Sequence, residues 1–166
     1  MRRGFFLFGI LALTLLSCEK INSDRKIWDI SPVVVALQVV NANGVDLLNP
    51  DNQNSYAAAN IKAFYSGKEY ECNKSISEVY TKAYLPHFYG LKIFKNNIGS
   101  YYLHFGELEG AKSYSNEEVI IFWGDGTSDK IKFNRTFRWI HGDPDISEDW
   151  FLNGSKVSGG VIKIIK

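Results

Sequence analysis

Short apolar runs separated by turn residues occupy most of this chain. From Pro32 onward, such runs recur about every eight to twelve positions, a spacing typical of antiparallel sandwiches and barrels. No long segment has helical periodicity. The pattern predicts an all-β fold over residues 32–166: a single antiparallel β-sandwich, immunoglobulin-like or transthyretin-like, with a small barrel as the alternative. The predicted strands are Val33–Val40, Ile61–Tyr65, Lys68–Cys72, Ser77–Tyr84, Tyr89–Phe94, Tyr101–Leu108, Val119–Trp123, Lys130–Asn134, Arg135–Ile140 and Val161–Ile165.

Several of these segments carry enough pattern to predict their place in the sheets. Val33–Val40 is apolar on both faces, which is typical of a central strand. Tyr101–Leu108 alternates between two faces, and Ser66–Gly67 is a short turn between two strands. Because a sandwich without disulfides needs large rings in its core, we expect Trp123 and Trp139 to be buried.

The first 17 residues have the organisation of a signal peptide. Arg2 and Arg3 are followed by the apolar segment Gly4–Leu16 and then by a small residue before Cys18. As a helix, the 13 apolar residues would span about 20 Å, which is short of the ~30 Å hydrocarbon core. A cleaved leader is therefore expected rather than a transmembrane anchor.

The cleavage site Leu15-Leu16-Ser17-Cys18 resembles the bacterial lipobox. The resemblance implies a diacylglycerol thioether on Cys18, cleavage before it and acylation of the new amino terminus; a plain signal peptide is the alternative. Three acyl chains would anchor the protein stably, which one chain cannot do. The mature chain would hold 149 of the 166 residues, with polar residues 18–31 as a tether.

Charge and cysteine content narrow the possible partners. The chain has 19 basic and 18 acidic residues, so it lacks the basic excess of nucleic-acid binders. Loss of Arg2 and Arg3 leaves the body weakly acidic, and we therefore expect the lipid alone to hold it at an anionic membrane.

With Cys18 acylated, Cys72 is the one remaining thiol, so no intramolecular disulfide forms and Cys72 is expected to be buried and inert.

Trp123-Gly124-Asp125-Gly126-Thr127 is the most distinctive string of the body. It resembles the strand-end turn of PKD-type immunoglobulin-like domains, which implies a spacer or interaction module. Asp-Gly is a tight-turn dipeptide because the aspartate bonds nearby backbone and glycine accepts positive φ. We expect this segment to join Val119–Trp123 to the strand that begins at Lys130.

The segment His141–Asp149 gathers four carboxylates and a histidine. We expect it to be a solvent-facing acidic loop. Calcium, which takes six to eight oxygen ligands, would be bound by Asp143, Asp145 and Asp149, although the EF-hand order is missing. No cofactor is otherwise expected, because the sequence has none of the common nucleophile, phosphate-binding or zinc motifs.

Aromatic residues suggest a second kind of site. Tyr84 and Tyr89 flank Pro86, and Trp150 follows the acidic segment. Flat rings beside carboxylates suit the apolar face and the hydroxyls of a sugar. Tyr84, Tyr89 and Trp150 are therefore the candidate ligand-binding residues.

As a whole, the chain is similar to small outer-membrane lipoproteins of Bacteroides-type bacteria. The resemblance implies an outer-membrane location and no particular activity. Only Glu19 is acidic among the residues just after Cys18, which leaves both the periplasmic and the surface face open. The expected function is a lipid-anchored cell-envelope binding or structural module, not an enzyme, that docks a protein partner or a glycan. The alternative is an envelope hydrolase that uses the acidic loop, with calcium.

Overall fold

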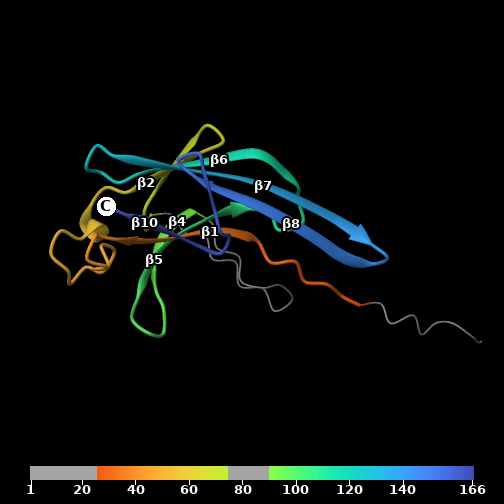
Figure 1. Ribbon diagram of the computed structural model, residues 1–166, viewed down its shortest axis with the longest axis horizontal. Coiled ribbons are helices and arrows are strands. Elements are labelled where there is room, and N and C mark those ends of the chain that lie inside the picture. The colour runs from red at the N-terminus through yellow and green to blue at the C-terminus, as the bar shows by residue number, and fades with distance from the viewer. Residues whose placement is uncertain (1–25, 75–89) are drawn as a thin grey trace, which may run out of the picture.

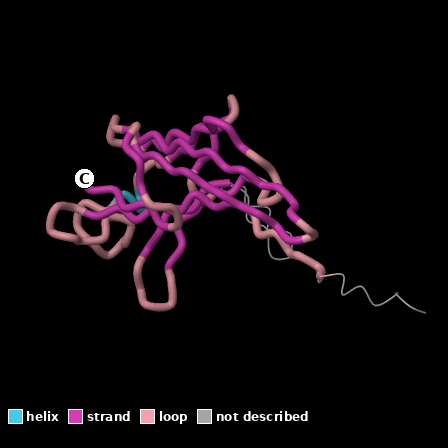
Figure 2. The backbone as a smooth tube through the Cα atoms, turned by 45° about the vertical axis from the view of Figure 1, so that its right-hand side comes forward, coloured by secondary structure: helices cyan, strands magenta, loops and turns pink. Residues whose placement is uncertain are grey.

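The computed structural model describes residues 26–74 and 90–166, which form a β-sandwich of two sheets (Figure 1). The first sheet has four strands, in the order β10 (Val161–Ile165), β1 (Val33–Val40), β5 (Tyr101–Leu108) and β4 (Gly90–Lys95). The second has six, in the order β3 (Lys68–Glu71), β2 (Lys62–Tyr65), β6 (Tyr114–Phe122), β7 (Ser128–Ile140), β8 (Asp143–Leu152) and β9 (Ser155–Val157). Figure 2 shows how completely strands dominate; the helix among the described residues is one 3-10 turn, η2 (Tyr56–Ala58).

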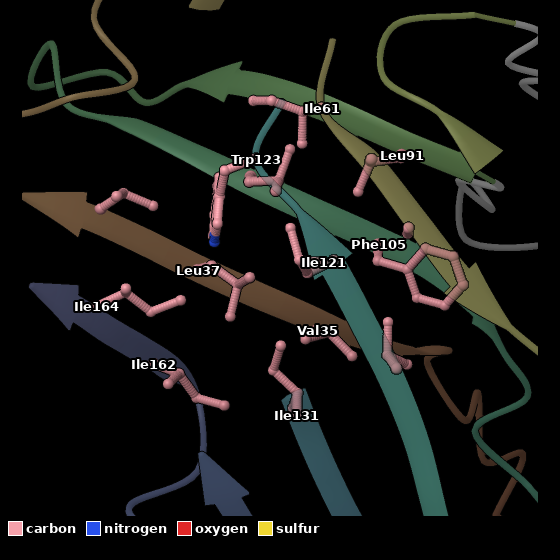
Figure 3. Close-up of a cluster of buried hydrophobic side chains, with 14 of the residues drawn as sticks. Val35, Leu37, Ile61, Leu91, Phe105, Ile121, Trp123, Ile131, Ile162 and Ile164 are labelled. Atoms are coloured by element: carbon pink, nitrogen blue, oxygen red, sulfur yellow. The ribbon is translucent and has the colours of Figure 1, made fainter. Parts of the chain in front are cut away.

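The core lies between the facing sides of the two sheets (Figure 3). In β1, every second residue from Val33 to Val39 is buried, as strand alternation requires. β1 pairs with β5 on one side and with β10 on the other, so its predicted central position is confirmed. The β1–β10 pairing is parallel, whereas the other strand pairs described are antiparallel.

The expectation of an acidic loop over residues 141–149 is wrong. Only His141 and Gly142 form the turn, both with positive φ, and the acids that follow belong to β8. In β8, Asp143, Asp145 and Asp149 occupy outward positions, while Pro144, Ile146, Glu148 and Trp150 share the opposite side. Strand alternation was therefore present in the sequence, but the density of carboxylates on one face concealed it.

Two further expectations in this region need correction. Lys130–Asn134 and Arg135–Ile140 are parts of one strand, β7, rather than two. Trp139 is 53% exposed, not in the core, because it lies on the last part of β7. Trp123, by contrast, is completely buried as expected.

Cys72 lies where an edge of the second sheet meets the first. It forms an isolated parallel bridge to Leu91 of β4, and the next residue, Asn73, donates its backbone N–H to the Leu91 carbonyl at 2.8 Å. Burial raises the pKa of the Cys72 thiol to about 11. Cys72, expected to be buried, is instead half-buried, and its raised pKa keeps the thiol protonated at neutral pH.

Some predicted features lie outside the described residues: the signal peptide, Cys18, Ser77–Tyr84 and Tyr89. Over residues 26–74 and 90–166, no helix has the length and apolar character needed to span a bilayer.

Candidate functional site

The hairpin of β7 and β8 is longer than the sheet that faces it. Inward-facing residues pair along the hairpin in the order Phe133–Trp150, Arg135–Glu148, Phe137–Ile146 and Trp139–Pro144. The first pair is buried, whereas Trp139 and Ile146 are exposed. We call residues 136–147, beyond the Arg135–Glu148 pair, the arm; its end extends past the other strands in Figure 1.

Residues Lys26–Pro32 run beside this arm instead of leaving the domain directly, and we call them the N-terminal segment. At one end, Lys26 Nζ lies 3.0 Å from Asp143 Oδ1 at the start of β8. At the other, the Ser31 carbonyl packs on Gly110 so closely that a Cβ added to Gly110 would lie 1.8 Å from the Ser31 oxygen. The last part of the expected tether is therefore docked on the sandwich.

A cleft of about 470 Å³ lies between the N-terminal segment and the inner side of β8. Residues 28–34 form one wall, and Pro144 and Ile146 form the other. Arg135, Glu148 and Trp150 lie at its floor, nearest the core. The cleft thus combines apolar walls with a polar floor, a composition common in ligand sites.

The floor is a hydrogen-bonded set of three side chains. Arg135, 7% exposed, donates from Nη2 and Nε to the Gly110 carbonyl at 2.6 and 3.2 Å and forms an ion pair with Glu148. Trp150 Nε1 donates to Glu148 Oε2 at 3.0 Å. Because a buried charge needs a partner, this set neutralises Arg135 and fixes the direction of the Glu148 carboxylate.

Trp150 does not form the exposed platform expected from the sequence. It is 5% exposed, and its ring stacks on Phe133 with centroids 4.8 Å apart. Tyr84 and Tyr89, the other two candidates, lie outside the described residues. The accessible aromatic residue of the cleft is instead Trp28, which is 44% exposed. The apolar residues of the tether around Trp28, Ile27 and Ile30, were the signal that could have revealed it.

The three acids proposed for calcium do not converge. Strand alternation places Asp143, Asp145 and Asp149 on the side of β8 opposite Glu148 and Trp150. Each forms an ion pair with a different cation, and among the residues that the structure describes no three His, Cys, Asp or Glu side chains gather into a group suited to a metal. The pairs are Lys26–Asp143 at 3.0 Å, Arg138–Asp145 at 2.5 Å and Lys156–Asp149 at 2.6 Å.

The Trp123–Thr127 segment forms the expected turn between β6 and β7. Asp125 accepts hydrogen bonds from the Thr127 hydroxyl at 2.7 Å, from Tyr56 and from the Thr127 backbone, which together lower the Asp125 pKa to about 2. A Cβ on Gly124, which has a φ of +82°, would lie 2.9 Å from the backbone nitrogen of Asn60. The motif therefore needs glycine for close packing.

Behind this turn lies a second buried polar group, centred on Asp129. Its carboxylate accepts hydrogen bonds from Trp123 Nε1 and Asn153 Nδ2, both at 2.7 Å, and pairs with Lys166 Nζ at 2.7 Å. Burial alone would raise the Asp129 pKa, but these three partners together lower it. The group ties the end of the chain to the turn, and its contacts give it a structural role.

The chain matches no protein-family model, no curated protein and no solved structure in the comparisons made. The function of the cleft therefore has to be inferred from its shape and chemistry. It has one half-exposed indole, apolar walls and a carboxylate held in place by a buried arginine. Such a site can stack a flat apolar surface and accept hydrogen bonds from hydroxyl groups.

Proposed function

We propose that this protein is a lipid-anchored binding module of the cell envelope that holds a carbohydrate in the cleft between its N-terminal segment and β8. The observation that carries the proposal is the cleft itself, about 470 Å³ with apolar walls and a fixed polar floor. Its size lies within the range of small-molecule sites, and the paired side chains of Arg135 and Glu148 lie together at one end.

The chemistry of the cleft favours a sugar over a purely apolar ligand. The C–H face of a pyranose ring would lie on the indole of Trp28, and its hydroxyls would reach the Glu148 carboxylate and the polar groups of Asp29 and Ser31. Arg135 holds Glu148 in place, so little side-chain freedom is lost on binding. A protein partner that inserts a side chain into the same cleft is the other form of this proposal.

The lipid anchor rests on the lipobox-like Leu15–Cys18 sequence. Seven residues lie between Cys18 and Lys26, and even a fully extended chain over the eight residue steps from one to the other spans at most about 29 Å. An acylated Cys18 would therefore hold the arm, and the cleft beside it, close to the outer membrane. A binding role needs no catalytic group, and we assign none.

The hydrolase alternative draws no support from the arrangement of the acids. Asp143, Asp145 and Asp149 lie on the outer side of β8, and each is paired with a cation of its own. Most glycoside hydrolases use two carboxylates that flank one bond in a shared cleft. The acidic segment has no such pair.

The proposal is tested with the full-length protein purified from membranes in detergent. We expect a panel of envelope polysaccharides to show selective binding, and Trp28→Ala to weaken that binding roughly two- to tenfold, the range set by one aromatic stacking contact. Phe122→Ala is the matched control, because Phe122 is 42% exposed against 44% for Trp28 but does not line the cleft.

The outcomes separate the two forms of the proposal. No selectivity among polysaccharides, together with one co-purified envelope protein that Trp28→Ala releases, would replace the carbohydrate with a protein partner. Binding that Trp28→Ala leaves unchanged would show that the cleft is not the site.

A further inference from the structure

Exposed apolar side chains gather at the end of the arm. Of the eleven large hydrophobic residues that are exposed in the described chain, five lie here, and they include both exposed tryptophans. The chain's other two tryptophans are buried in the core. We call these five residues the apolar tip: Ile27, Trp28, Trp139, Ile140 and Ile146.

Contacts on two separate segments bring the apolar tip together. The Phe137 and Trp139 rings meet edge to face, with centroids 5.5 Å apart. Lys26 bonds Asp143 at the turn, and its Nζ lies 5.9 Å from the centre of the Trp28 ring. The N-terminal segment and the end of the arm lie side by side in Figures 1 and 2. Both segments therefore contribute to the tip, in which Trp139 and Ile146 lie on the inner side of the hairpin and Ile140 on its outer side.

The basic side chains around the apolar tip are paired with acids. Lys26 bonds Asp143, and Arg138 bonds Asp145 at 2.5 Å. Paired charges carry little net field, so they neither draw the tip to an anionic surface nor repel it. Long basic side chains such as Lys26 and Arg138 can also keep their charged ends in water while their stems lie on apolar surface.

The position of the tip relative to the anchor identifies what covers it. The N-terminal segment starts at Lys26, eight residues after Cys18, so Lys26, which pairs with Asp143 beside the tip, lies within about 29 Å of the acylated Cys18. Tryptophan is enriched at the membrane–water interface, where its ring lies at the level of the headgroups. Scattered exposed apolar residues are ordinary on a protein surface, but a gathered patch marks an interaction site.

We propose that the end of the apolar tip formed by Trp139 and Ile140 inserts into the interfacial region of the membrane that carries the Cys18 lipid, while Trp28 and Ile146 stay in the cleft. This inference rests on the proposed lipid anchor and adds a second attachment, which orients the domain. The floor of the cleft at Arg135 is four β7 residues from Trp139, or about 14 Å along the strand. The contact would thus hold the cleft mouth beside the bilayer surface with its floor farther out.

The test measures quenching of tryptophan fluorescence by lipids brominated in the upper acyl chain. The full-length protein is reconstituted in vesicles of phosphatidylethanolamine and phosphatidylglycerol. We expect the wild type to be quenched and Trp139→Ser/Ile140→Ser to lose most of the quenching, although Trp28 remains. Neither substituted residue lines the cleft, so ligand binding is scored separately. Ile98→Ser is the control, because Ile98 is 85% exposed and lies between β4 and β5, away from the arm.

Equal quenching in the wild type and the double variant would overturn the membrane contact. So would self-association of the wild type that the double variant abolishes, because a second copy would then cover the tip. The mass of the amino-terminal peptide, measured on the same sample, reports the anchor independently. An unacylated Cys18 contradicts the anchor whatever the tip does, and failure of the tip contradicts only the second attachment.

Discussion

The inner and outer halves of the β7–β8 hairpin show the same strand alternation, but the inward-facing side chains are buried in the inner half and exposed in the outer half. In the inner half, Phe133 and Trp150 face each other across the strands and are 0% and 5% exposed. In the outer half, Trp139 faces Pro144 from the same side of the hairpin and is 53% exposed. Alternation decides which side a residue faces, whereas burial depends on whether another layer covers that side.

The boundary between the halves is a charged pair. Arg135 and Glu148 lie one pair beyond the buried aromatic rings and one pair before the exposed residues of the arm. The apolar core ends here, and the N-terminal segment, not a strand, covers the next part of the hairpin. Because a chain segment rather than a second sheet faces this part of the hairpin, the space between them is a cleft and not a continuation of the core.

The largest expected effect contrasts Trp150→Ala with Trp139→Ala. Loss of the buried, stacked ring of Trp150 should lower the free energy of unfolding by roughly 3–5 kcal/mol. Loss of the exposed Trp139 ring should change it by no more than about 0.5 kcal/mol. Chemical denaturation measures both values, and similar losses would show that a protein layer covers the arm in solution.

Glu148→Ala should lower the free energy of unfolding by less than the loss of the buried Trp150 ring does, but by more than the loss of a surface ion pair does. Arg135 would keep its bonds to the Gly110 carbonyl but lose its counter-charge, and because Glu148 is 28% exposed we expect a cost of roughly 1–3 kcal/mol. Glu118→Ala, which removes the exposed pair with Lys130, should cost at most about 1 kcal/mol. If Arg135→Met combined with Glu148→Leu failed to recover stability, the boundary pair would not act through its charge.

The Asp129 group should make stability fall at acid pH. Its folded-state pKa is lowered, so the stabilisation is complete above the unfolded value of about 3.9 and is lost as the pH falls through the folded value. Asp129→Asn should cost roughly 1 kcal/mol at neutral pH, since the amide keeps one acceptor oxygen. Denaturation over an acid series should show this difference shrinking below about pH 4; a constant difference would contradict the role of the charge.

The smallest effect on global stability is expected for Gly110→Ala. The new methyl would overlap the Ser31 carbonyl, so the N-terminal segment must leave its position while the sandwich stays folded. Hydrogen exchange should become faster across residues 26–32 and stay unchanged in β5. A loss of protection throughout both sheets would mean that the docked segment is an integral part of the fold.

Strand bounds and buried residues could be predicted from the sequence where the inward-facing positions of a strand are all apolar. β1, β5 and β10 have their predicted bounds, and Trp123 is buried as expected. These segments lie in the covered part of the sandwich, where the side facing the core is apolar throughout.

The candidate site was much harder to predict, because it depends on tertiary coverage. The outward acids of β8 dominate its composition and so predict a loop, and alternation alone predicts Trp139 in the core because it cannot show where the opposing sheet ends. The contact of Ser31 with Gly110, which creates one wall of the cleft, joins residues far apart in the chain. Neither local pattern nor composition carries that information.

Hydrogen exchange of the protein with and without the polysaccharide selected by the binding panel tests the central claim most directly. We expect slower exchange in residues 28–34 and 144–150, the two walls of the cleft, and no change in the hairpin of β4 and β5. Slower exchange confined to that hairpin or to the outer side of β8, with both walls unchanged, would contradict the assignment of the cleft as the binding site.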